Sequence, residues 1–370
     1  MAIFGTIHNV RISGVACAVP EKVVCNDFFI SRFGEEKMKN FEKMVGVKER
    51  HVAPDCMTAS DLAFRAAEEL QGLWNSNDVD AIIFVSQTPD YQLPATACVL
   101  HHRLGVKKAC FAFDVNLGCS GFVYGIYIAS SLLNSGSVKK ALLMGGDCLL
   151  KLVSVDDQSA APLFGDSGFA VVLDYDESAP LIDYSFCTDG SGYKAIIQPG
   201  ITYAGRMPVA YAKDMKHRDI GNLVTRMGDD TMCPSELHMD GMDVFNFTIN
   251  EVPDLIKEQM ERSGVSESDI DLMVLHQANR FVLKNVAMAT GISMKKVPIS
   301  MDRYGNTSSA SIPITLCDYA ERNSESGKKR ILMSGFGVGL SWGTLLTDLD
   351  FSLCRKIVLG ADVFAEGRID

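Results

Sequence analysis

The sequence predicts an α/β fold built from two similar halves, and three observations support this prediction. The chain has 370 residues, of which 47% are hydrophobic and 22% charged, as expected for a globular protein with a large buried core. Short apolar runs bounded by turn residues alternate with stretches of helical periodicity. Two of these runs recur later in the chain, in the same order and at nearly equal spacing. Together these features favour duplication of one unit of strands and helices.

The repeat consists of two pairs of matched segments. Residues 78–87 read Asp-Val-Asp-Ala-Ile-Ile-Phe-Val-Ser-Gln, and residues 268–277 read Ser-Asp-Ile-Asp-Leu-Met-Val-Leu-His-Gln. Residues 140–146, Lys-Ala-Leu-Leu-Met-Gly-Gly, return at 329–335 as Lys-Arg-Ile-Leu-Met-Ser-Gly. We expect all four segments to be buried strands. Chance likeness between hydrophobic strands would explain either pair alone, but it does not explain both.

The two halves are expected at residues 1–175 and 176–350, followed by a tail at residues 351–370. The boundary is placed after the apolar run 169–173. Residues 200–236 mix glycine, proline, charged residues and methionine without sustained periodicity. We interpret them as an insertion over the active-site face, because long irregular segments in compact domains are often functional.

Composition excludes several classes of function. The formal net charge of −11 excludes an overall basic surface of the kind that binds nucleic acid. The longest apolar stretch, residues 121–133, is too short to span a bilayer, and the N-terminus lacks the features of a signal peptide. The eleven cysteines and seven histidines show no metal-ligand spacing, so we expect reduced thiols, no metal site and a cytoplasmic location.

Cys119 is the first candidate for chemistry. It lies in Asn116-Leu-Gly-Cys-Ser-Gly121, where an apolar run reaches a turn of small residues, and a helical pattern follows. The N-terminus of a helix favours a thiolate, and its free N–H groups can hold an oxyanion. An inert buried cysteine is an equally good interpretation of this local pattern alone.

Two further candidates lie in the second half. His276 directly follows an expected strand, which is where open α/β sheets place their chemistry. Asn306 lies in the turn Tyr304-Gly-Asn-Thr-Ser-Ser309, before an expected helix. A structural histidine and an ordinary turn asparagine are the plainer interpretations. The glycine-rich loop 335–343 is not a phosphate cradle, because it lacks the lysine of that motif.

In combination, these motifs resemble the β-ketoacyl-acyl carrier protein synthase III family. The resemblance covers roughly residues 5–350 and rests on five motifs in order: Asn116–Phe122, Gly165–Gly168, His276–Asn279, Tyr304–Ser309 and Gly335–Gly343. It implies a thiolase-like fold, in which two pseudo-duplicated halves form layers in the order α-β-α-β-α. It also implies a homodimer that needs no metal or organic cofactor.

The resemblance implies a Cys-His-Asn triad of Cys119, His276 and Asn306. Cys119 would accept an acyl group from a thioester of coenzyme A or of an acyl carrier protein. A malonyl thioester, expected on acyl carrier protein, would then lose CO₂, with His276 and Asn306 bound to the enolate. The product would be a 3-oxoacyl thioester for fatty-acid or related acyl-chain biosynthesis. The main-chain amides of Cys119 and Val338 would form the oxyanion hole.

The sequence also departs from the family pattern. In the family, a tryptophan and an arginine sandwich the adenine of coenzyme A, and Asn40 and Met44 occupy their positions here. This difference favours acyl groups on a carrier protein over acyl-coenzyme A as donors. Phe281 replaces the family's docking arginine. Arg280 and Lys284, close to it in the sequence, are the candidates for carrier docking. The alternative is that both are ordinary solvent-exposed charges without a docking role.

Leu93 is similar in position to an aromatic residue that, in the family this chain resembles, the partner subunit supplies to the acyl pocket. Leu93 and the 200–236 insertion therefore predict a primer other than acetyl. Two alternative functions stay open: an acyltransferase that passes the acyl group to an alcohol or amine without decarboxylation, and an inactive structural partner of another ketosynthase.

Overall fold

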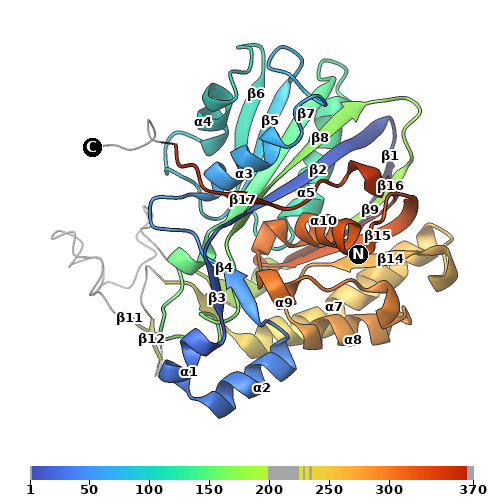
Figure 1. The fold of residues 1–370 in the computed structure, drawn as a ribbon. Coiled ribbons are helices and arrows are strands. Elements are labelled where there is room, and N and C mark those ends of the chain that lie inside the picture. The colour runs from blue at the N-terminus through green and yellow to red at the C-terminus, as the bar shows by residue number, and fades with distance from the viewer. Residues whose placement is uncertain (1, 199–224, 228–229, 233–235, 365–370) are drawn as a thin grey trace.

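The protein is described by a computed structural model over residues 2–198, 225–227, 230–232 and 236–364. Most of the predicted insertion at 200–236, and the end of the tail at 365–370, lie outside the described residues. Two sheets form the centre of the fold (Figure 1).

The first sheet has the strand order β17-β2-β8-β7-β5-β6. Its strands span, in chain order, Val10–Pro20 (β2), Ala81–Val85 (β5), Phe111–Val115 (β6), Lys140–Asp147 (β7), Ser167–Tyr175 (β8) and Val358–Gly360 (β17). The second sheet has the order β1-β9-β16-β15-β14. Its strands span Ile3–Ile7 (β1), Ile182–Thr188 (β9), Leu272–Leu275 (β14), Lys328–Gly337 (β15) and Ser341–Asp350 (β16). Short two-stranded ribbons complete the strands: Val23–Cys25 (β3) with Glu49–His51 (β4), Ile196–Ile197 (β10) with His238–Met239 (β13), and Thr225–Met227 (β11) with Asp230–Met232 (β12).

The predicted duplication is visible in the strand register. In the first sheet β5 pairs with β7 in parallel, and Val85 faces Gly145. In the second sheet β14 pairs with β15 in parallel, and Leu275 faces Ser334. These are matching positions of the two repeats, so both halves pair the same two strands in the same register.

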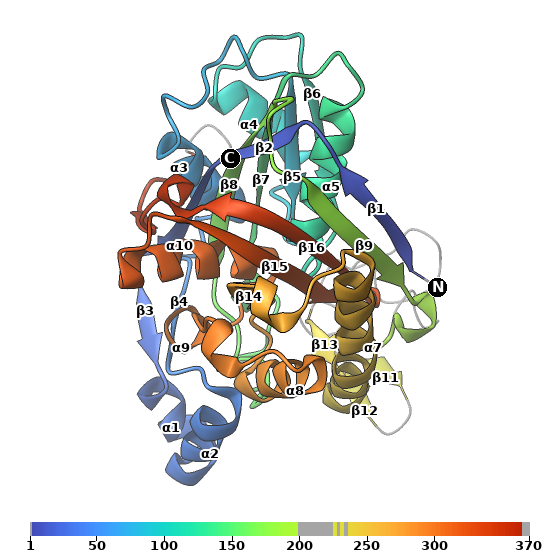
Figure 2. The same ribbon diagram turned by 90° about the vertical axis from the view of Figure 1, so that its right-hand side faces the viewer.

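Helices fill three further layers, which gives the predicted α-β-α-β-α order. The helices are Asp27–Phe33 (α1), Glu35–Val45 (α2), Ala59–Glu68 (α3), Thr96–Arg103 (α4), Gly121–Leu133 (α5), Gly241–Arg262 (α7), Arg280–Thr290 (α8), Met301–Tyr304 (α9) and Ser311–Asn323 (α10). Helices α5 and α10 pack between the sheets in one apolar core that includes side chains of both. Helices α3 and α4 cover the outer face of the first sheet, and α7 and α8 cover that of the second. Figure 1 shows these two outer layers at opposite ends of the molecule, and Figure 2 shows β15 and β16 crossing its middle above α8.

Local sequence signals explain where the helices near the site begin and end. The Asn279 side chain caps α8 by accepting a hydrogen bond from the Val282 N–H at 2.8 Å. Gly291 ends that helix in the left-handed conformation. Asp240 caps α7 in the same way by accepting from Met242 and Asp243. These caps fix the start of each helix, and so the position of the residues that precede it.

The chain ends cross between the predicted units. Strand β1 comes from the segment 1–175 but pairs with β9 in the second sheet. Strand β17 comes from the tail and pairs with β2 in the first sheet. At residue 364 the tail is still attached, because the Phe364 N–H donates to Asp61 and the Phe364 ring lies against the Arg103 guanidinium.

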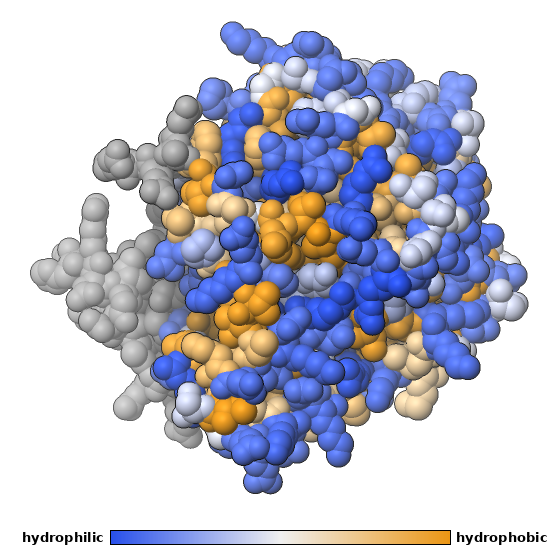
Figure 3. All heavy atoms as spheres, in the orientation of Figure 1, coloured by the Kyte–Doolittle hydropathy of each residue, from blue (hydrophilic) through white to orange (hydrophobic). Residues whose placement is uncertain are grey.

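The surface carries apolar residues in small separate groups. On the face drawn in Figure 3, hydrophilic residues predominate and the apolar ones form several patches between them. Scattered apolar side chains of this kind are usual on proteins. No helix within the described ranges combines the length and apolarity needed to cross a bilayer.

Candidate active site

One pocket lies where the two halves meet, and it contains the residues that the sequence singled out. Its volume is about 110 Å³. Cys119, His276, Asn306 and Val338 all line it, although they are far apart in the sequence. The fold therefore brings the predicted triad into a single site.

Cys119 occupies the turn between β6 and α5. The side chain is buried, with 7% of its surface exposed. Gly337, at the end of β15, has a positive φ of 158°, and a Cβ on it would lie 2.6 Å from the Cys119 Cβ. Only glycine permits this close approach, which brings the loop of the second half against the thiol of the first.

The protonation state of Cys119 differs from the sequence-based expectation. Burial raises its pKa to about 12, and the charge of Asp147 acts in the same direction. The Ser308 side chain and hydrogen bonds from the main chain of Cys119 and Val338 lower it, but by less. The helix N-terminus was expected to favour a thiolate; that expectation is wrong for the unliganded site, because the cost of desolvating the anion is larger.

The contacts of Cys119 nevertheless show which groups surround its sulfur. The main-chain N–H groups of Cys119 and Val338 are close enough to the sulfur to lower the pKa of the thiol. These are the two amides that the family resemblance assigned to the oxyanion hole. Two main-chain donors near the nucleophile can stabilise charge that develops on an oxygen there.

His276 follows β14, and its ring is buried against the second sheet. Its Nδ1 lies 2.7 Å from the Ser311 Oγ, and its ring contacts that of Phe336 edge to face at 5.4 Å. Burial lowers the pKa of His276 to about 3, while a hydrogen bond to the Ser308 main chain acts in the opposite direction. The imidazole is therefore neutral at physiological pH.

Asn306 is held by main-chain bonds to a loop of the first half. Its N–H donates to the Leu163 carbonyl at 2.9 Å, and its own carbonyl accepts from the Gly165 N–H at 3.0 Å. Its Oδ1 accepts from the Ser308 N–H at 3.0 Å. Because the oxygen of the amide is engaged in this way, its NH₂ group remains as a donor in the pocket.

Ser308 adopts a left-handed conformation, with a φ of 50°. This conformation is unfavourable for a residue with a side chain and is often found at functional sites. It turns the chain sharply after Asn306 and places the start of α10, with Ser311, beside His276.

Asp147 connects the two halves behind the thiol. This fully buried carboxylate ends β7 and accepts hydrogen bonds from the Gln87 N–H at 2.7 Å and the Ser86 hydroxyl at 3.2 Å. Its other oxygen accepts from the Ser309 hydroxyl at 2.8 Å and the Ser309 N–H at 3.3 Å. Burial raises the pKa of Asp147, and these hydrogen bonds lower it. The carboxylate thus fixes the end of β5 to the turn that carries Asn306.

The rest of the pocket is mainly apolar. Its apolar side chains come from the first half, from α7, α8 and β15, and from the β10–β13 ribbon with the residue before β13: Leu149, Leu163, Phe164, Ile196, Leu237, Met239, Val244, Phe245, Val282 and Phe336. An apolar wall around a nucleophile suits a hydrocarbon chain, since each buried methylene contributes about 0.8 kcal/mol. Ile196 and Leu237, which lie on either side of the predicted insertion at 200–236, thus contribute to this wall.

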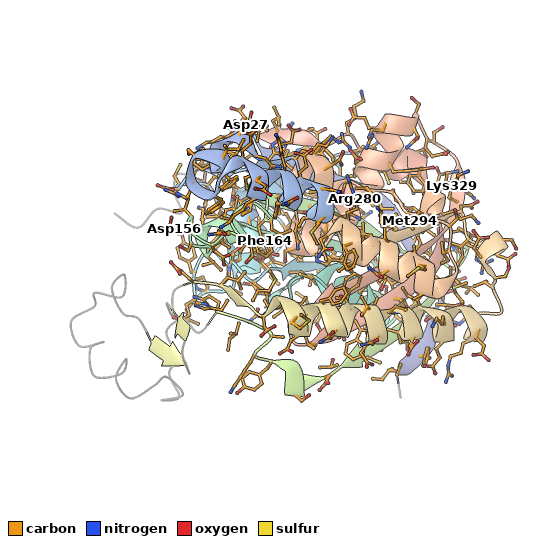
Figure 4. The ribbon with its side chains drawn as sticks, turned by 90° about the horizontal axis from the view of Figure 1, so that it is seen from below. Asp27, Asp156, Phe164, Arg280, Met294 and Lys329 are labelled. Atoms are coloured by element: carbon orange, nitrogen blue, oxygen red, sulfur yellow. The ribbon has the colours of Figure 1, made fainter. Side chains whose placement is uncertain are left out.

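The predicted docking residues lie at the start of α8, outside the pocket lining. The Arg280 side chain crosses to the C-terminal end of α2, where a Cβ on Gly46 would lie 2.9 Å from its Nε. Figure 4 shows Arg280 beside this blue helix. Lys284 is exposed, and neither cation forms an ion pair with any residue in the described ranges. Met44, on the same end of α2, is 61% exposed and offers no charge to a ligand.

Leu93 lies apart from the site within this chain. It is 86% exposed and does not line the pocket.

Sequence reasoning missed four residues of the site. Asp147 lies in an apolar strand, where its carboxylate could have been recognised as a buried exception to the pattern. Ser308 and Ser311 follow Asn306 in one motif, but their contacts depend on a left-handed turn that the sequence does not announce. Gln87 is the last residue of the first repeated segment and matches Gln277 in the second. This match gave no sign that the two glutamines have different surroundings. Within the described ranges, no group of three or more His, Cys, Asp or Glu side chains is arranged to hold a metal ion.

Comparisons with known proteins agree with this geometry. Residues 113–190 match the family described as 3-oxoacyl-[acyl-carrier-protein (ACP)] synthase III, and residues 260–349 match its C-terminal part. A β-ketoacyl-[acyl-carrier-protein] synthase III of Streptococcus sanguinis is 35% identical over 348 residues, which are 93% of this chain and 100% of that protein. The enzyme of the same name from Xanthomonas campestris is 32% identical over 91% of this chain and 97% of its own length.

A solved structure shows the same likeness in three dimensions. The 3-oxoacyl-(acyl-carrier protein) synthase of Burkholderia xenovorans superimposes with a TM-score of 0.87 at 34% identity, over 96% of this chain and 99% of the other. Shared identity along nearly the whole length, together with the shared fold and the Cys-His-Asn pocket, leads to one conclusion. This chain belongs to the β-ketoacyl-[acyl-carrier-protein] synthase III family.

Proposed function

We propose that this protein is an acyltransferase of the ketosynthase type, which condenses an acyl group on Cys119 with a malonyl thioester and releases CO₂. The observation that carries the proposal is the convergence of Cys119, His276 and Asn306 on one apolar pocket, with two main-chain donors at the sulfur. Its relatives named above carry this activity in their names, and the arrangement of polar groups here suits each step.

In the first step the Cys119 sulfur attacks the carbonyl of an acyl thioester. A new S–C bond forms, the bond to the donor thiol breaks, and the proton of Cys119 leaves with the released thiol. Since the pKa of Cys119 is raised to about 12, the thiol is neutral before the donor arrives. The amides of Cys119 and Val338 stabilise the oxyanion of the tetrahedral intermediate.

In the second step the malonyl thioester loses CO₂, and its enolate attacks the acyl carbon on Cys119. The Cys119 sulfur leaves and takes up a proton from solution, and the product is a 3-oxoacyl thioester. In the tautomer proposed for this step, Nδ1 of the neutral His276 accepts from the Ser311 hydroxyl, 2.7 Å away, and the imidazole proton is on Nε2. That N–H and the NH₂ group of Asn306 then hydrogen-bond the enolate oxygen.

The malonyl group is proposed to arrive on an acyl carrier protein. Arg280 and Lys284 form a small basic pair near the pocket, free of ion pairs with described residues, and such a pair can attract an acidic partner by charge complementarity. The primer is proposed to come from a carrier, because Asn40 and Met44 cannot sandwich an adenine. It is proposed to be other than acetyl because of Leu93 and the 200–236 insertion. A homodimer is proposed from the exposed Leu93, and a cytoplasmic location from the sequence.

Intact-protein mass spectrometry after incubation with acyl-carrier and acyl-coenzyme A donors tests the first step. We expect a mass increase equal to the acyl group. Hydroxylamine should remove this adduct, as it does a thioester, and the Cys119→Ser variant should form no adduct that hydroxylamine releases in this way. Release of labelled CO₂ from malonyl-carrier tests the second step. Acylation without CO₂ release, with transfer to an alcohol or amine, would favour the acyltransferase alternative; absence of acylation by every donor would favour an inactive partner.

Charge reversal tests carrier docking. Arg280→Glu and Lys284→Glu should each raise the KM for malonyl-carrier severalfold, because rim charges steer association. The KM for a malonyl-N-acetylcysteamine thioester, which has no carrier, should stay the same. Equal effects on both substrates would contradict a docking role.

A further inference from the structure

Gln87 is a polar residue of the pocket whose side-chain amide is used neither by the fold nor by the proposed reaction. It follows β5 and lines the same cavity as Cys119. Its side-chain oxygen lies 2.2 Å from the point where a Cβ on Gly118 would stand, one residue before the nucleophile. Only glycine at position 118 leaves room for it.

The main chain of Gln87 is fixed, whereas its side-chain amide has no hydrogen-bond partner in the part of the chain that the structure describes. The N–H donates to the buried carboxylate of Asp147 at 2.7 Å, so the residue cannot easily move away from the site. No hydrogen bond to the Gln87 side chain is found among residues 2–198 and 236–364. The amide also keeps some accessible surface, since its atoms are absent from the fully buried unpaired groups of the same ranges.

The matching residue of the second repeat provides an internal comparison. Gln277 occupies the same position after β14, but its amide is saturated. Its Nε2 donates to the carbonyls of Leu275 at 2.9 Å and Pro298 at 3.4 Å, and its Oε1 accepts from the Ser300 N–H at 3.0 Å. The fold therefore uses the glutamine of one repeat as a brace and leaves that of the other facing the cavity.

An unpaired amide in an apolar pocket favours one kind of ligand. A plain hydrocarbon chain on Cys119 would strip water from the amide and return no hydrogen bond, which is costly. An acyl group with an oxygen near its thioester end would restore the bond. The Ser308 hydroxyl, 3.1 Å from the same point above Gly118, adds a second polar group on that side.

We infer that Gln87 recognises an oxygen substituent of the primer, so that the preferred acyl group is a short chain carrying a hydroxyl or keto oxygen near the thioester. The amide can donate to either oxygen and can also accept from a hydroxyl. This inference rests on the proposed function, since it requires that Cys119 be acylated.

The test compares butyryl, 3-hydroxybutyryl and 3-oxobutyryl thioesters of N-acetylcysteamine, which need neither an adenine site nor a carrier. Acylation of Cys119 is followed by mass spectrometry. We expect at least one oxygenated donor, in one enantiomer for the hydroxyl, to react about tenfold faster than butyryl, the effect of one hydrogen bond.

The Gln87→Met variant keeps the length of the side chain and removes the amide. We expect its preference to fall to about one, mainly because the oxygenated donor slows. Thr248→Val is the matched control: Thr248 also lines the pocket, but its hydroxyl donates to the Phe245 carbonyl at 2.9 Å, so the preference should not change.

Each outcome separates the two proposals. If butyryl acylates the wild type at least as fast as both oxygenated donors, or if Gln87→Met retains the preference, Gln87 does not read an oxygen and the ketosynthase proposal stands. If Gln87→Ala accepts longer hydrocarbon donors while Gln87→Met behaves as wild type, the residue only limits pocket length. If neither these thioesters nor the acyl-carrier and acyl-coenzyme A donors described above acylate Cys119, both proposals fail.

Discussion

The two repeats place equivalent positions at the edge of the site and use them differently. In the first repeat the residue after β5 is Ser86, which donates to Asp147 at the end of β7. In the second repeat the equivalent pair is His276, after β14, and Phe336, on β15, whose rings are in edge-to-face contact. The same backbone arrangement thus supports a polar brace in one half and a neutral imidazole in the other.

This difference explains how two halves with the same backbone arrangement can perform two different chemical tasks. The first half carries the nucleophile, and its buried carboxylate anchors the loops around it. The second half carries the donors to an enolate, and its apolar surroundings keep His276 uncharged. Duplication supplies the geometry, whereas the residues after each strand decide what the geometry does.

The largest effect is expected from replacing, one at a time, the two equivalent residues that follow β14 and β5. His276→Ala should lower the rate of condensation about 10³-fold, because it removes a donor to the enolate, and should leave acylation of Cys119 nearly intact. Ser86→Ala, at the matching position, should change condensation by less than about tenfold. Single-turnover acylation and CO₂ release measure the two steps separately. Equal loss of both steps in His276→Ala would instead give the imidazole a role in activating the thiol.

The two glutamines should differ in stability. Gln277→Met should lower the free energy of unfolding by about 3 kcal/mol, because several buried main-chain groups lose their partner. Gln87→Met should change it by no more than about 0.5 kcal/mol, since the fold makes no use of that amide. Urea unfolding followed by tryptophan fluorescence measures both. Similar losses in the two variants would mean that the glutamines are not used differently.

The link between the halves through Asp147 should have a smaller effect. Ser309→Ala removes a buried hydroxyl bond of 2.8 Å and should cost about 1 kcal/mol of unfolding free energy. Ser352→Ala is the control, because its 2.7 Å bond to Asp350 is exposed and should contribute less than about 0.5 kcal/mol. If both variants unfold at the same urea concentration, the link between the halves adds nothing to stability.

The smallest effect of a substitution is expected on the reactivity of Cys119. Since its pKa is raised to about 12, its alkylation by iodoacetamide should accelerate about tenfold per pH unit from pH 7 to 10, without a plateau. Asp147→Asn removes a charge that raises this pKa, so alkylation at pH 8 should become severalfold faster. Peptide mass spectrometry follows Cys119, with the exposed Cys56 as the internal reference. A plateau below pH 9 would show that the free thiol is already activated.

Most of the fold could be predicted from the sequence, because it depends on local patterns. The apolar runs at 81–85 and 272–275 are long enough and regular enough to identify buried strands, and their repetition predicted two similar halves. The caps of α7 and α8 are visible as Asp240 and Asn279. In contrast, the pairing of β1 with the second sheet and of β17 with the first could not be predicted, because a strand's partner depends on distant segments.

The sequence by itself determined which residues stand at the ends of strands: the cysteine before a helix, the histidine after β14 and the asparagine in its turn. Only the tertiary structure decided what those residues experience. Burial sets Cys119 and His276 as neutral groups, against the effect expected from a helix N-terminus, because desolvation depends on every segment that surrounds the site. For the same reason one glutamine of the repeat is saturated and the other faces the pocket, although their sequence contexts match.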